Sequence, residues 1–351
     1  MRRAQGFSLI ELMVAMLVGL IVIGGGIYVY VSSQRNLNEV HASTEVSENG
    51  RFDLYVLSNA LREAGFMGEV ATSSIEVRTD IPVQVGGDCS IRSGVTSGIE
   101  DWSSQISTEN LITPVFVDFV KDNGYLFATQ DKEQGSTAVA ACLETESGVD
   151  QPGLLPFKAD SHLLVTKRVN ANAISAAASV TSKYAIVSNH IGGALYDSGD
   201  LADTMIQTGG EFVGGQFWEY EYEKFFVDDD ADGIPTLYRQ SMDTGAPEAL
   251  VAGIEDIRIR INQRESSDNL GEFVTTSDGR DPRDLDYSLV TVVEVFVLAR
   301  SIDSINSSAT NTARTYEVGG FSRTFDDGFK REVFTTTVTL RNPSMWALGE
   351  L

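Results

Sequence analysis

The chain has 351 residues, of which 26 are Lys or Arg and 50 are Asp or Glu, so its formal net charge at pH 7 is −24. A surface of that sign repels the phosphates of nucleic acids, which excludes DNA or RNA as a direct partner. The length suffices for one large domain or two small ones, and 42% of the residues are hydrophobic, enough for a folded core.

The first 31 residues combine a short basic leader with an apolar stretch long enough to cross a membrane. Arg2 and Arg3 precede it, and the twenty residues 12–31 include no Asp, Glu, Lys, Arg or His. Twenty helical residues at about 1.5 Å each span about 30 Å, the thickness of the hydrocarbon core of a bilayer. Because basic residues favour the cytoplasmic side, we expect the N-terminus in the cytoplasm and the bulk of the chain outside.

Glu11 stands at the head of this apolar stretch, where an intramembrane charge costs about 2.5–3.5 kcal/mol unless it is paired. The segment Gly6–Glu11 resembles the prepilin signal of type IV pilins and type II secretion pseudopilins. The resemblance implies that a prepilin peptidase cuts after Gly6 and that Phe7 becomes the N-methylated N-terminus. It also implies that Glu11 serves subunit assembly, by pairing with the ammonium of Phe7 on a neighbouring subunit. The alternative is a plain signal anchor with Glu11 at the membrane interface.

Apolar residues recur at helical spacing from Leu54 to Ala64. This predicts that one helix continues from about residue 7 to residue 64 and stops at Gly65 or Gly68. Such a helix is far longer than the average of a globular protein. The expected fold class is therefore α+β: a long N-terminal α-helix, with its first half in the membrane, packed on a C-terminal antiparallel β-sheet head, as in pilins.

Four aromatic or β-branched runs predict strands in the head, at residues 216–227, 254–261, 288–298 and 332–340. Within the second run, Ile257–Ile261 alternates strictly between Ile and Arg, which predicts one buried face and one solvent-exposed face.

We divide the chain into five segments. Residues 1–6 are a cytoplasmic leader, 7–31 a membrane or filament-core helix, and 32–68 an extension of that helix on the head. Residues 69–210 are a variable insertion or first lobe, and 211–351 a β-rich pilin head.

The segments Leu61–Gly68 and Lys330–Asn342 resemble the two ends of the PilW family of minor pilins, and Gly253–Ile259 and Val292–Arg300 resemble its central strands. The resemblance implies a non-enzymatic minor pilin that helps to initiate type IV pilus assembly at or near the tip. It implies contacts through the N-terminal helix with other minor pilins and the major pilin, and further contacts with the prepilin peptidase, the assembly platform and a tip adhesin. The implied location is the inner membrane with a periplasmic head, then the pilus at the cell surface.

Two other functions remain open at this point. One is a pseudopilin of a type II secretion system, and the other is a membrane-anchored adhesin whose acidic head binds its target with calcium. An enzyme is not indicated, because the sequence has no Gly-x-Ser-x-Gly elbow, no phosphate-binding loop and no His-Glu-x-x-His helix.

Cys89 and Cys142 are the two cysteines, and we expect a disulfide between them in a head exported to an oxidising compartment. The closed loop would stabilise the fold by about 4 kcal/mol in the chain-entropy model. Members of the PilW family often have a cysteine where this chain has Glu69, so a pairing carried over from the family does not apply here.

Asp228, Asp230 and Asp232, followed by Gly233, match the first half of a calcium-binding loop, in which alternate carboxylates wrap one cation. The twelfth position is Arg239, where such loops have a bidentate Glu. The alternative is an acidic hairpin turn without a metal. We therefore expect no required cofactor, with calcium as the one candidate ligand.

Overall fold

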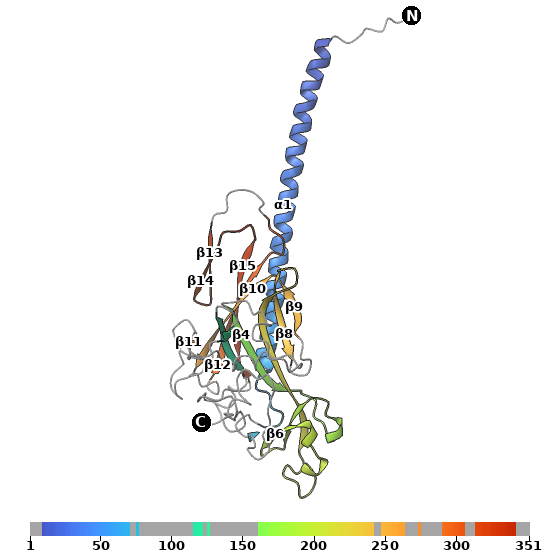
Figure 1. Ribbon diagram of the computed structural model, residues 1–351, viewed down its shortest axis with the longest axis vertical. Helices are drawn as coiled ribbons and strands as arrows, with labels where there is room; N and C mark the ends of the chain where they lie inside the picture. Colours follow the sequence, from blue (N-terminus) through green and yellow to red (C-terminus); the bar gives the residue numbers. More distant parts are fainter. Residues whose placement is uncertain are drawn as a thin grey trace, which may run out of the picture.

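The computed structural model describes residues 9–70, 75–76, 115–121, 125–126, 161–241, 247–263, 273–274, 290–305 and 313–341. Within these ranges the chain forms one long helix and a β-rich head beside the second half of that helix (Figure 1). The expected α+β class, with one long N-terminal helix followed by antiparallel sheets, is confirmed.

The helix α1 runs from Leu9 to Glu63, 55 residues without a break. It ends where the sequence predicts, because Gly65 and Gly68 both have positive φ (76° and 80°), a conformation that side chains with a Cβ rarely adopt. The backbone N–H of Gly65 then donates to Lys167 O at 2.8 Å, and Val169 N donates to Phe66 O at 2.8 Å. These bonds tie the end of the helix to the head.

The larger sheet is built around β7 (Gln216–Asp229), the longest strand of the head. Its strands follow the order β1-β6-β5-β7-β4-β2-β3, and β8 and β9 extend from the second half of β7. All pairings are antiparallel except β1 with β6. The other strands are β1 (Ile75–Glu76), β2 (Val115–Lys121), β3 (Tyr125–Leu126), β4 (His162–Val169), β5 (Tyr184–Ser188), β6 (Gly193–Asp197), β8 (Pro235–Ser241) and β9 (Glu248–Ala252).

β4 and β5 precede residue 211 and both pair with β7. One sheet therefore runs across the boundary placed there from the sequence. Between β4 and β7 in the sequence, three short 3-10 turns (Ala177–Ser179, Ser198–Asp200 and Asp203–Met205) surround a small second core around Tyr196, Phe212 and Phe217.

The second sheet has four antiparallel strands in the order β11-β10-β12-β15. These are β10 (Ile254–Gln263), β11 (Phe273–Val274), β12 (Val290–Arg300) and β15 (Arg331–Thr339). A separate hairpin, β13 (Arg314–Val318) with β14 (Phe321–Phe325), lies against the same sheet. Each of the four strand runs predicted from the sequence is confirmed, as β7, β10, β12 and β15.

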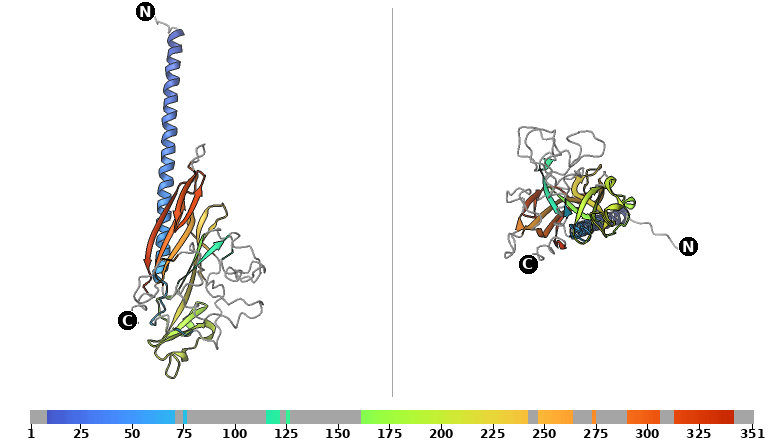
Figure 2. Two further views of the ribbon diagram at one scale, coloured as in Figure 1. Left: turned by 90° about the vertical axis from the view of Figure 1, so that its left-hand side faces the viewer. Right: turned by 90° about the horizontal axis from the view of Figure 1, so that it is seen from below.

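The helix packs on one face of the four-stranded sheet (Figure 2). Val46, Leu57 and Leu61 on α1 are fully buried in one cluster with the inward side chains of β12 and β15. Burial of a large aliphatic side chain contributes about 1.5–3 kcal/mol each. The predicted leucine face is thus the face that holds the head.

The hairpin β13–β14 corrects one prediction about the opposite face of this sheet. The alternation in β10 predicts that Arg258 is exposed to solvent, but its side chain is only 2% exposed. Phe321 of β14 covers the Arg258 guanidinium, with the ring centroid 4.2 Å from Cζ, while Arg260 further along the strand keeps 34% exposure. The hairpin, which is distant in sequence, buries Arg258 although the alternation of β10 alone predicts that this residue is exposed to solvent.

The two sheets are joined at the start of β4. Ile257 N donates to Ser161 Oγ at 3.1 Å, and Ile259 N donates to His162 Nδ1 at 2.9 Å. Burial, and secondly the nearby charge of Arg258, lower the pKa of His162 well below its ordinary value, so the ring stays neutral and can accept this bond. Two side chains thereby take the place of a neighbouring strand beside β10.

Candidate functional site

The first half of α1 stands clear of the head (Figure 1). Its apolar side chains are exposed around the whole circumference of the helix. Leu9, Leu20 and Tyr28 are each more than 75% exposed, and other large apolar residues as far as Val31 are exposed as well. The helix is long and apolar enough to cross a membrane. A helix that is apolar all round has to be covered by lipid or by other helices.

Glu11 lies in the first turn of α1, at the end of the helix remote from the head. The N-terminal end of a helix favours a negative charge, because its free N–H groups carry partial positive charge. Gly6 and Phe7 lie outside the described residues. The roles assigned to Gly6, Phe7 and Glu11 from the sequence stay predictions.

The second half of α1 approaches the sheet so closely that a side chain at Gly50 would collide with a ring of β15. A Cβ at Gly50 would come within 2.2 Å of Phe334 Cδ2 on β15, so the ring lies directly against the helix backbone. Beside it, Asn49 Nδ2 donates to Ala252 O at 3.0 Å. Phe334 belongs to the four-stranded sheet and Ala252 to β9 of the larger sheet, so these contacts fix the helix against both sheets.

Asp53 lies on the buried face of α1, one turn after Gly50. It is fully buried, and neither carboxylate oxygen has a hydrogen-bond partner among the described residues. Burial raises the pKa of Asp53 well above its ordinary value, because an ionised carboxylate without partners is strongly disfavoured in an apolar setting. The side chain therefore stays protonated in the folded state under conditions in which an exposed Asp is ionised.

We predict that Asp53→Asn makes the folded protein more stable at neutral pH and flattens its pH dependence. The folded-state pKa lies above the unfolded one, so the native state binds more protons and the free energy of unfolding falls as pH rises from about 4 through the folded pKa. The loss is about 1.4 kcal/mol for every unit by which the pKa is raised. Urea titrations of the full chain in detergent micelles, from pH 4 to pH 8, measure it.

The matched control is Glu48→Gln, which removes an exposed carboxylate of the same helix. That variant should retain the pH dependence of the unmodified chain. If Asp53→Asn follows the same curve as Glu48→Gln, Asp53 is not the group whose protonation stabilises the fold.

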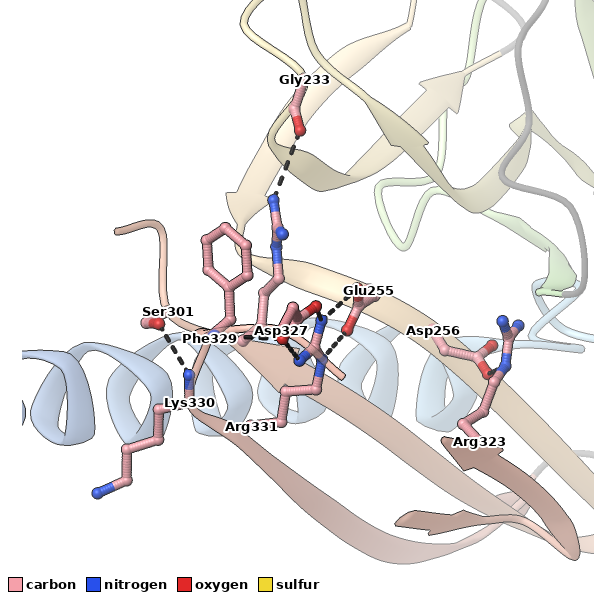
Figure 3. A network of polar contacts seen from close by, with 10 residues as sticks. Gly233, Glu255, Asp256, Ser301, Arg323, Asp327, Phe329, Lys330 and Arg331 are labelled. Atoms are coloured by element: carbon pink, nitrogen blue, oxygen red, sulfur yellow. Dashed lines mark hydrogen bonds and ion pairs between the residues drawn. The ribbon is translucent and has the colours of Figure 1, made fainter. Parts of the chain in front are cut away.

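A network of charges joins β10 to the start of β15 on the opposite face of the sheet (Figure 3). The guanidinium of Arg331 donates to both oxygens of Glu255 and to both oxygens of Asp327. Its Nη2 lies 3.1 Å from Glu255 Oε1 and 2.7 Å from Asp327 Oδ2. Hydrogen bonding from Arg331 lowers the pKa of Asp327. The ring of Phe325 covers the guanidinium, 3.7 Å from Cζ.

Asp256, the next residue of β10, holds two arginines. Its Oδ2 accepts from Arg258 Nε at 3.0 Å and from Arg323 Nε at 3.1 Å, and the carboxylate is about 1% exposed. Arg323 belongs to β14, so this ion pair fastens the hairpin to the sheet that it covers. Burial raises the pKa of Asp256, and the two arginines oppose that effect.

We predict that Arg331→Met destabilises the fold by about 3–5 kcal/mol, because it leaves the buried carboxylate of Glu255 without its cation. Arg331→Lys should lose less, since it keeps the charge but not the two parallel bonds. The double variant Arg331→Met with Glu255→Met should recover much of the loss, because no charge is left unpaired. Urea unfolding of the full chain measures each value.

The control is Arg260→Met, which breaks a pair with Glu294 whose side chains are 34% and 22% exposed, and which should cost less than about 1 kcal/mol. Equal losses for Arg260→Met and Arg331→Met would contradict the importance given to burial of the Arg331 network.

The acidic segment after β7 forms a tight turn between β7 and β8. Asp230 Oδ1 accepts from the backbone N–H groups of Asp232 and Ile234, both at 2.9 Å, and Asp228 Oδ1 accepts from Asp229 N at 2.7 Å. Gly233 has a φ of 75°, which favours glycine. Across the described ranges, no group of three His, Cys, Asp or Glu residues is arranged to hold a metal ion. The hydrogen bonds fit the hairpin-turn alternative, and calcium binding stays a prediction.

If Asp228, Asp230 and Asp232 bind calcium, chelation should lower the melting temperature of the protein, because a ligand that binds only the folded state stabilises it. Asp230→Asn should abolish the difference while keeping the turn, since the amide oxygen can still accept the two backbone bonds. Melting curves in calcium and in chelator test this. Coincident curves for the unmodified chain would leave the hairpin turn as the whole explanation.

Cys89 and Cys142 lie outside the described residues, so their disulfide stays a prediction.

The burial of Asp53 can be predicted from the sequence, because Asp53 lies four residues before Leu57 on the same apolar face of the helix. Nothing in the sequence indicates that Arg331 meets Glu255, because the two are 76 residues apart.

Comparison with known proteins matches two parts of the chain. Residues 224–342 match the family model described as Type IV Pilus-assembly protein W, and residues 1–27 match the prokaryotic N-terminal methylation motif. No curated protein matches the sequence. Among solved structures, the chain is similar to a type IV-like pilin, TTHA1219, from Thermus thermophilus, with 12% identity and a TM-score of 0.23 over 52% of this chain and 78% of that one.

Proposed function

The chain is a type IV pilin of the PilW family, and on this premise we propose that it is a non-enzymatic minor pilin that helps to initiate type IV pilus assembly. In this proposal it is held in the inner membrane before assembly, with its head in the periplasm, and is then incorporated at or near the pilus tip. Other minor pilins and the major pilin contact it through α1, and the prepilin peptidase and the assembly platform act on it before incorporation.

The observation that supports this proposal is the division of α1 into two halves. One half is buried on its own sheet through Val46, Leu57 and Leu61, while the other is apolar and exposed from Leu9 to Val31. An apolar cylinder of this length is stable in lipid and equally stable among the apolar helices of other subunits. Such a helix can move from a membrane into a filament without a change in its own structure.

In this proposal, Glu11 determines where an incoming subunit binds in the filament. Its carboxylate lies near the start of the helix, where cleavage after Gly6 would place the ammonium of Phe7 on each subunit. Opposite charges in an apolar setting attract far more strongly than in water. In the proposal, an incoming subunit is fixed in position by this pair.

Peptide mass analysis of membrane-extracted protein should therefore find methylated Phe7 at the N-terminus, and an intact Met1 in a piliated strain would overturn the pilin assignment.

The central test is deletion of the gene in its own bacterium, followed by counts of surface pili in electron micrographs. We expect few or no pili, with recovery when the unmodified chain is supplied. Normal pilus numbers in the deletion strain would contradict a role in initiation.

Glu11→Leu separates assembly from membrane insertion in the same strain. The variant is more apolar, so it should insert in the membrane at normal levels and be cleaved after Gly6. It should nevertheless restore pili poorly, because the pairing charge is lost. Glu45→Leu, a change of the same kind in the second half of α1, is the control and should restore pili. Full restoration by Glu11→Leu would show that the charge pair is dispensable.

A further inference from the structure

Among the described strands, β15 forms one edge of the four-stranded sheet, and none of them pairs with its outer side. It pairs with β12 over nine residues, Arg331–Thr339, without a register shift. Within the described ranges, the backbone hydrogen bonds of these nine residues go to β12. Edge strands usually carry a lysine, a proline or a bulge that prevents pairing with another chain. From Val333 to Thr339 β15 has none of these, and its residues favour strand structure.

The second half of β15 is uncovered on the face opposite the helix. Thr335, Thr337 and Thr339 are exposed there, whereas Val338 on the other face is 2% exposed against α1. The hairpin β13–β14 covers only the start of the strand, where Arg331 meets Asp327 and Phe325. An added strand would therefore meet threonine side chains on one face and would not have to displace the hairpin.

The open edge ends at a groove with positive charge. The groove has a volume of about 480 Å³ and is lined by Arg62 from the last turn of α1, by Thr337, Val338 and Thr339 of β15, and by Arg341. Arg62 makes no hydrogen bond or ion pair among those that the structure describes. Arg62 and Arg341 belong to different parts of the chain and both line this groove, in a protein whose net charge is −24. Arginine pairs of this kind favour a carboxylate as their ligand.

Membrane polarity excludes one occupant, a second copy paired through its own β15. Strands that pair antiparallel about a two-fold axis point in opposite directions, and every vector along the strand is reversed with them. β15 runs alongside α1 (Figure 2). Two copies joined in this way would point their apolar helices in opposite directions, which one membrane or one filament cannot accommodate. A symmetric pair of β15 strands is therefore not the occupant.

We propose that the outer edge of β15 accepts an extended, acidic segment of a second pilin subunit as an added strand, with an Asp or Glu of that segment between Arg62 and Arg341. Main-chain hydrogen bonds would supply affinity and the two arginines would fix the register. This inference rests on the proposed function, because it names the contact through which one minor pilin joins the next.

The test places a photo-cross-linking amino acid at Thr337 of the full chain, expressed in its own bacterium. The matched control carries the same amino acid at Thr324, an exposed threonine of β14. We expect irradiation to yield one adduct from Thr337 and none from Thr324. Mass analysis of the adduct should map it to a strand segment, containing Asp or Glu, in the head of another protein with its own prepilin signal.

Charge reversal at the groove then tests the register. Arg62→Glu with Arg341→Glu should lower the adduct yield at least tenfold, while Arg62→Lys with Arg341→Lys should keep most of it. Thr335→Lys, a substitution of the kind that natural edge strands carry, should block the adduct without lowering the melting temperature.

Any of four results would overturn the inference. They are no adduct at Thr337, equal adducts at both positions, an adduct with residues 342–351 of the same chain, and an adduct with β15 of a second copy. Piliation keeps these results apart from a failure of the proposed function. If pili depend on the chain but the adduct is absent, only the β15 contact is wrong, whereas normal piliation in the deletion strain refutes the proposed role itself.

Discussion

The buried face of α1 holds the four-stranded sheet, and the remaining structure is arranged around that contact. Val46, Leu57 and Leu61 supply the apolar area, and Gly50 lets Phe334 approach the helix backbone. The contact includes one unfavourable element, the buried carboxyl of Asp53, which has no hydrogen-bond partner among the described residues and whose pKa is raised by burial. A helix that carried only its own apolar stripe would be free to slide along the sheet. The close fit at Gly50 and the hydrogen bond from Asn49 to β9 of the larger sheet oppose this sliding.

On the other face of the same sheet, charge takes the place of apolar contact. Asp256 binds Arg258 and Arg323, and Arg331 binds Glu255 and Asp327, with aromatic rings of the hairpin covering the guanidinium groups. Buried ion pairs add little net stability compared with well-packed apolar side chains, but removing one partner is costly. Such a network therefore selects one position of the hairpin over others.

In the part of the chain that the structure describes, two further surfaces are exposed. The first half of α1 is apolar on all sides, and the second half of β15 presents an open edge that ends between two arginines. In the proposed filament, α1 makes contacts shared by all subunits of the family, whereas the β15 edge offers directional hydrogen bonds and charge. A subunit with both kinds of surface can join a common helical core and still bind one neighbouring subunit specifically.

The sequence by itself determined the long helix, its end near Gly65, the four strand runs of the head and the prepilin signal around Gly6 and Glu11. Each depends on local patterns, namely apolar spacing, the freedom of glycine at positive φ, and the length of an apolar stretch. The tertiary structure alone decided that Arg258 is buried, that Arg331 meets Glu255, and that β4 and β5 join the sheet of β7. These features depend on contacts between residues tens of positions apart, and the alternation of one strand carries no information about what folds over it.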